Sequence, residues 1–126
     1  MTTQQIPKDD WKRFLNNLSR HGELETRDAE IEVLGLHLGD QIAAEWVPLY
    51  GLSYDGRSDT LEVDLQDHMH RIQHPERLYA ELQGTELASI LAIDSEGLQH
   101  IIRLRTPLSL PRLKSLVTTG LKTQRG

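Results

Sequence analysis

The stretch IAAEWVPLYGLSY, residues 42–54, carries the longest alternation of side-chain character in the chain. Every second residue from Ile42 through Trp46 to Tyr54 shares one parity, whereas the other parity is mixed. Because successive side chains of a strand point to opposite faces, this period of two predicts a long β-strand. Pro48 has no N–H to give to a neighbouring strand, so we expect the strand to be an edge or to be kinked there.

Further strands are expected on both sides of this stretch. Upstream, residues 31–38 have the pattern of a strand that is interrupted by a bulge at Gly35. Downstream, a turn over residues 55–59 leads to a half-buried strand over residues 61–65. The remaining predicted strands are residues 78–83, 87–93 and 98–105.

Residues 66–74 interrupt this series of strands. Met69 and Ile72 lie three positions apart, a spacing that places two side chains on the same side of a helical turn. Pro75 restricts the backbone of the residue before it, which would end such a turn. The segment therefore predicts a short helical insertion.

An amphipathic helix is expected over residues 8–20, ahead of the strands. Its stripe contains the only phenylalanine of the chain and one of the two tryptophans, so we expect the helix to pack against the sheet. Gly22 can adopt the left-handed backbone that commonly ends a helix. The apolar residues follow the spacing i, i+3, i+4 and i+7: Trp11, Phe14, Leu15 and Leu18.

Together these segments predict an α+β fold, with an N-terminal helix followed by a bent, mostly antiparallel sheet of about five or six strands. Short connections favour pairing between sequential strands, and the expected shape is a small open barrel. A chain of 126 residues with 37% hydrophobic residues supports one core, so we expect a single domain over residues 6–108. Residues 109–126 form a basic tail, for which we expect partial disorder or a short helix.

The composition excludes several classes of protein and site. The chain has no cysteine, so it holds no disulfide and no thiolate metal site. No apolar run approaches the roughly 20 residues that cross a bilayer, and the first residues lack the apolar core of a signal peptide. We therefore expect a cytoplasmic protein that does not enter a membrane.

Charge is divided unevenly along the chain, whose formal net charge is −5. Residues 1–102 contain 8 basic and 19 acidic side chains, whereas residues 103–126 contain 6 basic and no acidic ones. The acidic body argues against broad nucleic-acid binding, which needs a basic surface. The basic end leaves a nucleic-acid-contacting accessory role, or contact with a protein, as alternatives through Arg103, Arg105, Arg112 and Lys114.

Three histidines lie close together in the sequence, namely His68, His70 and His74. Two histidines four positions apart on a helix would present both imidazoles on one face, as in many zinc sites. The spacing specifies no acidic ligand, and the alternative is a plain polar surface. The same segment carries the enzyme alternative, either metal-dependent or acid–base.

Aromatic side chains form a second candidate site. Trp46, Tyr50 and Tyr54 share one parity of the long strand, and with His74 and Tyr79 they could line a groove for a peptide or a base. The alternative is that these rings fill the core beneath the helix.

No nucleophile elbow and no phosphate-binding glycine motif occurs in the sequence, so catalytic residues stay unassigned and no cofactor is expected. The absence of these motifs favours a non-enzymatic binding or protein-interaction domain. We expect such a domain to self-associate through an exposed sheet edge, and its protein partner is unknown.

Four segments make up a composite pattern: Pro7–Trp11, IEVLGLHLGDQIAAEWVPLYGLSYD (31–55), HPERLYAEL (74–82) and LQHIIRLRTPL (98–108). In these segments the chain resembles an uncharacterised bacterial family, the domain-of-unknown-function family numbered 5335. The resemblance covers most of residues 6–108 and implies a stand-alone bacterial domain. It implies no activity, ligand or site residue, and the tail after Leu108 falls outside it.

Overall fold

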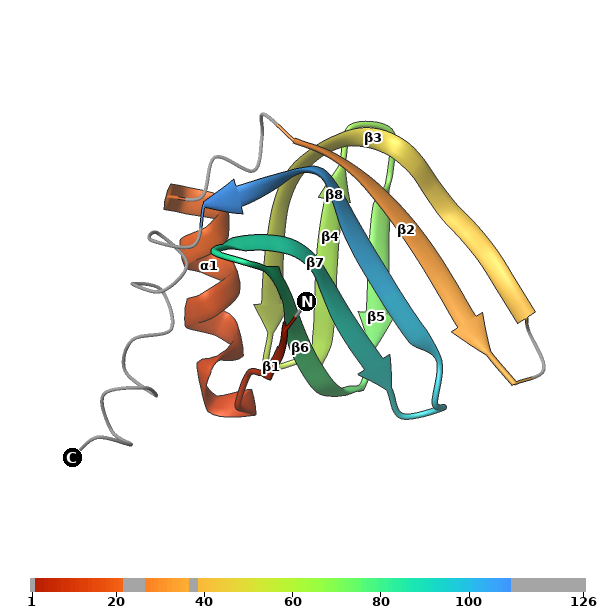
Figure 1. The fold of residues 1–126 in the computed structure, drawn as a ribbon. Coiled ribbons are helices and arrows are strands. Elements are labelled where there is room, and N and C mark those ends of the chain that lie inside the picture. Colours follow the sequence, from red (N-terminus) through yellow and green to blue (C-terminus); the bar gives the residue numbers. More distant parts are fainter. Residues whose placement is uncertain (1, 22–26, 37–38, 110–126) are drawn as a thin grey trace.

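The computed structural model describes residues 2–21, 27–36 and 39–109. In this part of the chain, one short strand precedes the helical segment and seven strands follow it. All eight strands belong to one antiparallel sheet (Figure 1). The elements are β1 (Thr2–Gln5), the 3-10 turn η1 (Lys8–Asp10), α1 (Trp11–His21), β2 (Asp28–Gly35), β3 (Gly39–Asp55), β4 (Thr60–Leu65), β5 (Met69–Gln73), β6 (Pro75–Gln83), β7 (Glu86–Asp94) and β8 (Gln99–Ser109).

The sheet is strongly curled, because two strands that are consecutive in the sequence lie near opposite ends of the strand order. The order is β1-β6-β7-β8-β2-β3-β4-β5, so β5 lies at one end and β6 lies next to the other. Only His74 separates β5 from β6 along the chain. A connection of one residue can join these strands only if the two ends of the sheet approach one another, as the curved sheet in Figure 1 shows.

The long strand β3 bends to serve both halves of this curled sheet. Its first half pairs with β2 and its second half with β4. Between the halves, Trp46 has a φ of 51° and the register against β2 shifts, which is the signature of a bulge. The bend lies two residues before Pro48, where the sequence predicts a kink or an edge.

The predicted α+β fold with five or six strands is wrong: the fold is mostly β and has eight strands in the described residues. The first strand, β1, precedes the helix and has the sequence TTQQ, which shows no apolar alternation. Its backbone is extended because it pairs with β6, from Thr2 opposite Leu82 to Gln5 opposite Tyr79. Pairing between such distant segments leaves no local pattern in the sequence.

The predicted helical insertion over residues 66–74 is also wrong. These residues contain β5, which pairs with β4. Ile72 is buried and Arg71 is exposed, so the true period is two. His70 takes the other inward position, and a histidine there hides the alternation that would identify a strand.

A smaller correction concerns the bulge predicted at Gly35. Gly35 pairs regularly with Gly39 at the end of the β2–β3 hairpin. The register shifts lie earlier in β2, between Ala29 and Glu32. The other predicted strands coincide with parts of β3, β4, β6, β7 and β8.

The predicted amphipathic helix is present as α1, preceded by η1. Its four apolar residues are buried and join the inward-facing side chains of the strands in one core. The helix packs chiefly against β3 (Figure 1). Trp11 fixes the start of α1, because its indole Nε1 donates a hydrogen bond of 2.8 Å to the carbonyl of Ile6.

Some sequence-based expectations fall on residues that the structure does not describe. They include the helix stop at Gly22 and the tail from residue 110 onward. Within the described ranges, no helix combines the length and apolar character that crossing a membrane requires.

Ser19 of α1 occupies the edge of β3 that β2 leaves uncovered. Its Oγ accepts a hydrogen bond of 2.8 Å from the N–H of Leu52 and lies 2.7 Å from the carbonyl of Leu52, to which it donates. A single hydroxyl thereby satisfies both backbone groups of one strand residue, as a neighbouring strand would.

Replacing Ser19 with alanine leaves these two part-buried backbone groups without a partner. We expect Ser19→Ala to lower the free energy of unfolding by about 1–3 kcal/mol, the usual penalty for an unsatisfied buried polar group. Urea denaturation followed by circular dichroism measures this change. Ser53→Ala, one residue along β3, is the matched control, and an equal loss in both variants would contradict the role given to Ser19.

Candidate functional site

Four polar side chains meet where β3 turns into β4 and β5 turns into β6. We call them the corner cluster: Lys8, Tyr54, Asp59 and His74. Asp59 lies at the centre, and its Oδ1 accepts a hydrogen bond of 2.6 Å from the hydroxyl of Tyr54. The same oxygen lies 3.5 Å from Nζ of Lys8, and Oδ2 lies 3.3 Å from Nδ1 of His74. The cluster therefore brings together three elements that are separate in the sequence.

The backbone of the corner cluster is unusual at two positions. Asp59 and His74 have φ angles of 52° and 55°, in the left-handed region that few residues other than glycine adopt. The N–H of His74 donates to the carbonyl of Asp59 at 2.8 Å, and the carbonyl of His74 accepts from Ser95 at 2.9 Å. These bonds join the β3–β4 turn, the β5–β6 junction and the β7–β8 turn into one corner.

The ionisation of the corner cluster is fixed by its contacts. The hydrogen bond from Tyr54, together with His74 and the positive charge of Lys8, outweighs burial and lowers the pKa of Asp59. Burial, reinforced by the hydrogen bond to Asp59 and its charge, raises the pKa of Tyr54 to about 12. The Tyr54 ring also meets Trp11 edge to face at 5.2 Å. At neutral pH the Tyr54 phenol is therefore neutral and the Asp59 carboxylate is charged. These states suit a hydrogen-bonded network that stabilises the fold.

A second polar group lies inside the curled sheet and is called here the buried relay: Asp94, His100 and His70. Nε2 of His100 lies 3.0 Å from Oδ2 of Asp94, and its Nδ1 lies 3.1 Å from Nε2 of His70. The side chains of Asp94 and His100 are only 10% and 8% exposed. The sequence does not predict the buried relay, because Asp94 lies between two predicted strands, His100 lies within one of them, and no motif links either residue to His70.

The three histidines predicted as a metal site do not come together. His68 contacts Asp67, His70 contacts His100, and His74 contacts Asp59. In the part of the chain that the structure describes, no group of three or more histidine or carboxylate side chains could hold a metal ion.

The residues predicted as an aromatic groove are also dispersed. Tyr54 and His74 share the corner cluster. The centroid of the Trp46 ring, in contrast, lies 5.1 Å from the guanidinium carbon of Arg105. Tyr50 is 50% exposed, and Tyr79 lies on β6 between Gln5 and Leu91 of the adjacent strands. Of the residues expected to line a groove, only Tyr54 and His74 lie together, where both contact Asp59.

Two of the predicted tail contacts, Arg103 and Arg105, lie on β8 and are paired with carboxylates. Arg103 donates to Glu30 at 3.1 Å and to Glu32 at 2.6 Å. Arg105 lies 3.6 Å from Asp28. Arg112 and Lys114 lie outside the described residues.

An apolar surface that sequence analysis missed covers the outer face of the sheet. Tyr79, Leu91 and Ile101 lie side by side on β6, β7 and β8, with Ile93 two residues along β7. All four point away from the core and are half-buried. We call these four residues the outer band: Tyr79, Leu91, Ile93 and Ile101.

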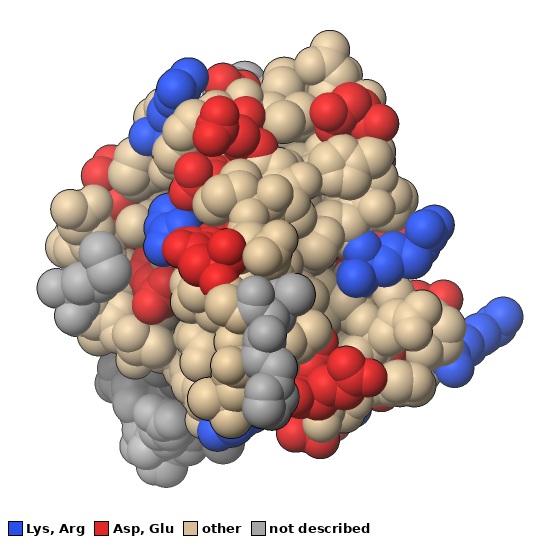
Figure 2. Space-filling model, turned by 90° about the vertical axis from the view of Figure 1, so that its right-hand side faces the viewer, with Lys and Arg blue, Asp and Glu red and all other residues tan. Residues whose placement is uncertain are grey.

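The two rows of paired residues that carry the outer band continue onto β2 and β3 and end in excess negative charge. The first row runs from Ile101 through Glu32 to Ile42, which is 50% exposed, and the second runs from Ile93 through Gln99 and Leu34 to Asp40. Three carboxylates, those of Glu30, Glu32 and Asp40, gather around Arg103. The hydrogen bond with Glu32 raises the pKa of Asp40, since one guanidinium does not neutralise three acids. Figure 2, which shows the side of the molecule opposite the helix, has several acidic side chains there among residues other than Lys and Arg.

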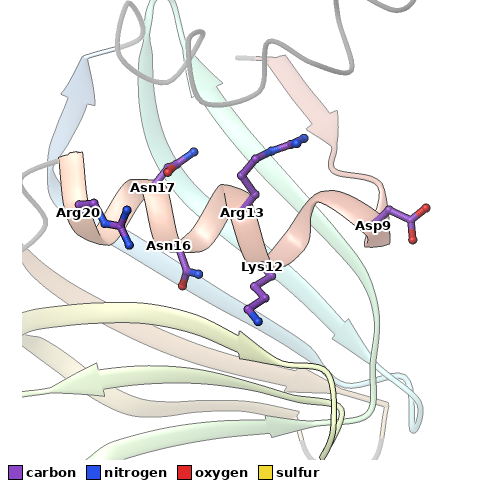
Figure 3. A pocket seen from close by; sticks show the side chains of 6 residues that line it. All are labelled: Asp9, Lys12, Arg13, Asn16, Asn17 and Arg20. Atoms are coloured by element: carbon purple, nitrogen blue, oxygen red, sulfur yellow. The ribbon is translucent and has the colours of Figure 1, made fainter.

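A hollow of about 440 Å³ lies along the outer face of α1. Lys12 and Asn16 project to one side of the helix and Arg13 and Asn17 to the other (Figure 3). Arg13 is paired with Asp10 at 2.6 Å. These are the water-facing side chains of an amphipathic helix, and their geometry specifies no ligand.

The corner cluster makes a direct prediction for stability. Asp59→Ala removes the acceptor of Tyr54 and places a less tolerant residue in the left-handed region, so we expect a loss of about 2–3 kcal/mol in the free energy of unfolding. Asp59→Asn keeps an acceptor oxygen and tolerates this backbone, so its loss should be about half as large. Urea denaturation of both variants measures these two losses. A larger loss for the asparagine variant than for the alanine variant would contradict the role given to Asp59.

Comparison with known proteins agrees with the resemblance seen in the sequence. The model of a family described as "Family of unknown function (DUF5335)" matches residues 2–113. The chain is 36% identical to an uncharacterized protein of the bacterium Aquifex aeolicus (strain VF5) over 112 residues, which are 88% of this chain and 99% of that protein. No solved structure matches the chain significantly. The chain thus belongs to the DUF5335 family of unknown function.

Proposed function

We propose that this chain is a protein-interaction domain that binds a second copy of itself through the outer band. The observation that carries the proposal is the outer band, because four large apolar side chains form a continuous surface on the sheet face that points away from the core. Contiguous apolar surface of this kind marks interaction sites in soluble proteins. It is the feature of this molecule that most resembles the centre of an interface.

The rows of the sheet indicate how two copies fit together. β8 lies midway between β6 and β3 in the strand order, so we place the twofold axis in the interface along β8. Ile101 of each copy then meets its counterpart, and Tyr79 of one copy lies opposite Ile42 of the other. In the second row, Ile93 lies opposite Leu34. Apolar side chains therefore meet at the axis and at the two ends of the first row, whereas Leu91 lies opposite Glu32. In the second row Gln99 lies on the axis.

The charges at the two ends of the rows complement each other under the same symmetry. Arg77 is exposed at the β6 end of the second row, and Asp40 is exposed at its β3 end. The twofold axis places Arg77 of each copy opposite Asp40 of the other, where it supplies the positive charge that the three carboxylates around Arg103 lack. Two symmetric ion pairs would then fix the orientation of the dimer.

The proposed contact lies on the face of the sheet, whereas the sequence predicts a contact at the sheet edge. The two end strands of the described sheet are short, and β1 is polar, which are features that protect an edge from pairing. Contact through an edge stays a prediction that awaits its own test.

The other expectations also stay predictions. The enzyme alternative rests on His68, His70 and His74, which have different partners in the structure. The nucleic-acid alternative rests on Arg103, Arg105, Arg112 and Lys114. Arg103 and Arg105 share their charges with carboxylates, and the other two lie outside the described residues. A cytoplasmic location is supported by the absence of cysteine and awaits a localisation experiment.

Sedimentation equilibrium at 10–100 μM tests the dimer. We expect the unmodified protein to dimerise and Ile101→Lys to be monomeric, because a lysine on the twofold axis would place two charges in an apolar contact. Tyr50→Lys, at an exposed aromatic residue outside the outer band, is the matched control and should leave the dimer intact. Circular dichroism establishes that each variant is folded.

A charge exchange tests the orientation of the two copies. Arg77→Asp and Asp40→Arg should each weaken the dimer about tenfold, and the double variant should restore it. A monomer at 100 μM would refute the proposal, as would an Ile101→Lys variant that dimerises normally. Dimers without rescue in the double variant would leave the outer band in the interface but overturn the twofold axis along β8.

A further inference from the structure

The buried relay links two strands that share no backbone pairing. Among the described strands, β5 is the last of the sheet and pairs with β4 alone. His70 belongs to β5, whereas His100 lies on β8 and is buried between Val33 and Ala92 of the flanking strands. The contact between the two imidazoles therefore ties the last strand to the opposite wall of the curled sheet.

The hydrogen bonds of the buried relay have a defined direction. The carboxylate of Asp94 accepts the N–H groups of Glu96 at 2.9 Å and Leu98 at 3.0 Å. Burial alone would raise the pKa of Asp94, but the hydrogen bonds from His100 and these two N–H groups lower it, so the group is ionised. Nε2 of His100 must then donate to Asp94. In a neutral His100 this leaves Nδ1 to accept from Nε2 of His70.

A proton on His70 disfavours this arrangement. It enters at Nδ1 and places a positive charge on a largely buried ring. Release of β5 returns the ring to water, where the charge is solvated, so protonation of His70 favours the released strand over the one whose ring lies 3.1 Å from His100.

We propose that the hydrogen bond between His70 and His100 is an acid-sensitive latch, which holds β5 in the sheet at neutral pH and releases it on acidification. The titratable groups that act on His70 are His100 on β8, His68 just before β5 and, through His100, Asp94 at the end of β7. Val63, which lies opposite His70 on β4, is apolar and offers the charged ring no partner.

The direction of the pH dependence follows from the proton affinity of His70. Burial, together with the neighbouring His100 and His68, lowers the pKa of His70 to about 4. In a released strand the pKa of a histidine returns to about 6.5. The released state therefore binds protons more tightly, so the latch is intact above about pH 6.5 and weakens as the pH falls towards 4.

Hydrogen exchange measured by NMR tests the latch. Uptake of one proton on release predicts that amide protection in β5, corrected for intrinsic exchange rates, falls about tenfold per pH unit between pH 6 and 5. Protection in β7 should fall much less. Loss of protection to the same extent in both strands, or constant protection in β5, would refute the latch.

Two variants separate titration from hydrogen bonding. His70→Gln keeps a side-chain N–H that can donate to His100 but cannot titrate in this range, so protection in β5 should become independent of pH. His68→Gln is the matched control and should retain the pH dependence. A His70→Gln variant with the original pH dependence would overturn the proposal.

The unmodified protein supplies a measurement that needs no variant to fold. Nitrogen-15 chemical shifts of the imidazoles report which ring nitrogen carries the proton. At pH 7.5 the latch requires neutral His70 and His100, each protonated at Nε2. Either ring protonated at Nδ1 would contradict the direction of the hydrogen bonds and with it the latch.

Discussion

One residue, His74, connects two strands that lie at nearly opposite ends of the sheet. This constraint determines the curl, because a single residue cannot cross a flat sheet of eight strands. The left-handed backbone at His74 and its hydrogen bonds to Asp59 and Ser95 are the local solution to this geometry. Much of the remaining architecture accommodates the closure, from the bend in β3 to the position of α1.

At two places in the described sheet, side chains join elements that backbone pairing leaves apart. Where β3 parts from β2, the hydroxyl of Ser19 replaces the missing strand, and the apolar stripe of α1 completes the core. Beyond β5, His70 reaches across the interior to His100. Both solutions place a polar group among apolar neighbours, and both satisfy it with hydrogen bonds.

The elements that the sequence predicts correctly are those with local patterns. The stripe of α1 and the alternation of β3 and β4 are visible within single windows of sequence, since burial on one face imposes a period of 3.6 or two. β1 and β5 escape detection because a polar strand pairs with a distant partner in one case and a histidine takes an inward position in the other. The corner cluster and the buried relay each bring together residues from separate segments of the chain. No spacing of residues in the sequence predicts such contacts.

One signal for the outer band was nevertheless present in the sequence. In residues 87–93, LASILAI, both parities of the strand contain large apolar residues, and Ile101 and Ile102 repeat this feature on the next strand. A strand that is apolar on both faces is either covered on both sides or carries an exposed apolar surface. Tyr79 completes that surface from a third strand, and only the register places it there.

The pairing of β1 with β6 has a consequence for how the chain acquires its structure during synthesis. Thr2 precedes its partner, Leu82, by 80 residues, so Leu82 is made only when most of the sheet has already been translated. Until then, the apolar stripe of α1 has no complete core to enter, because β6, β7 and β8 are still missing. Folding of this domain therefore depends on contacts between segments that are far apart in the sequence, and the apolar stripe of α1 stays incompletely covered until those contacts form.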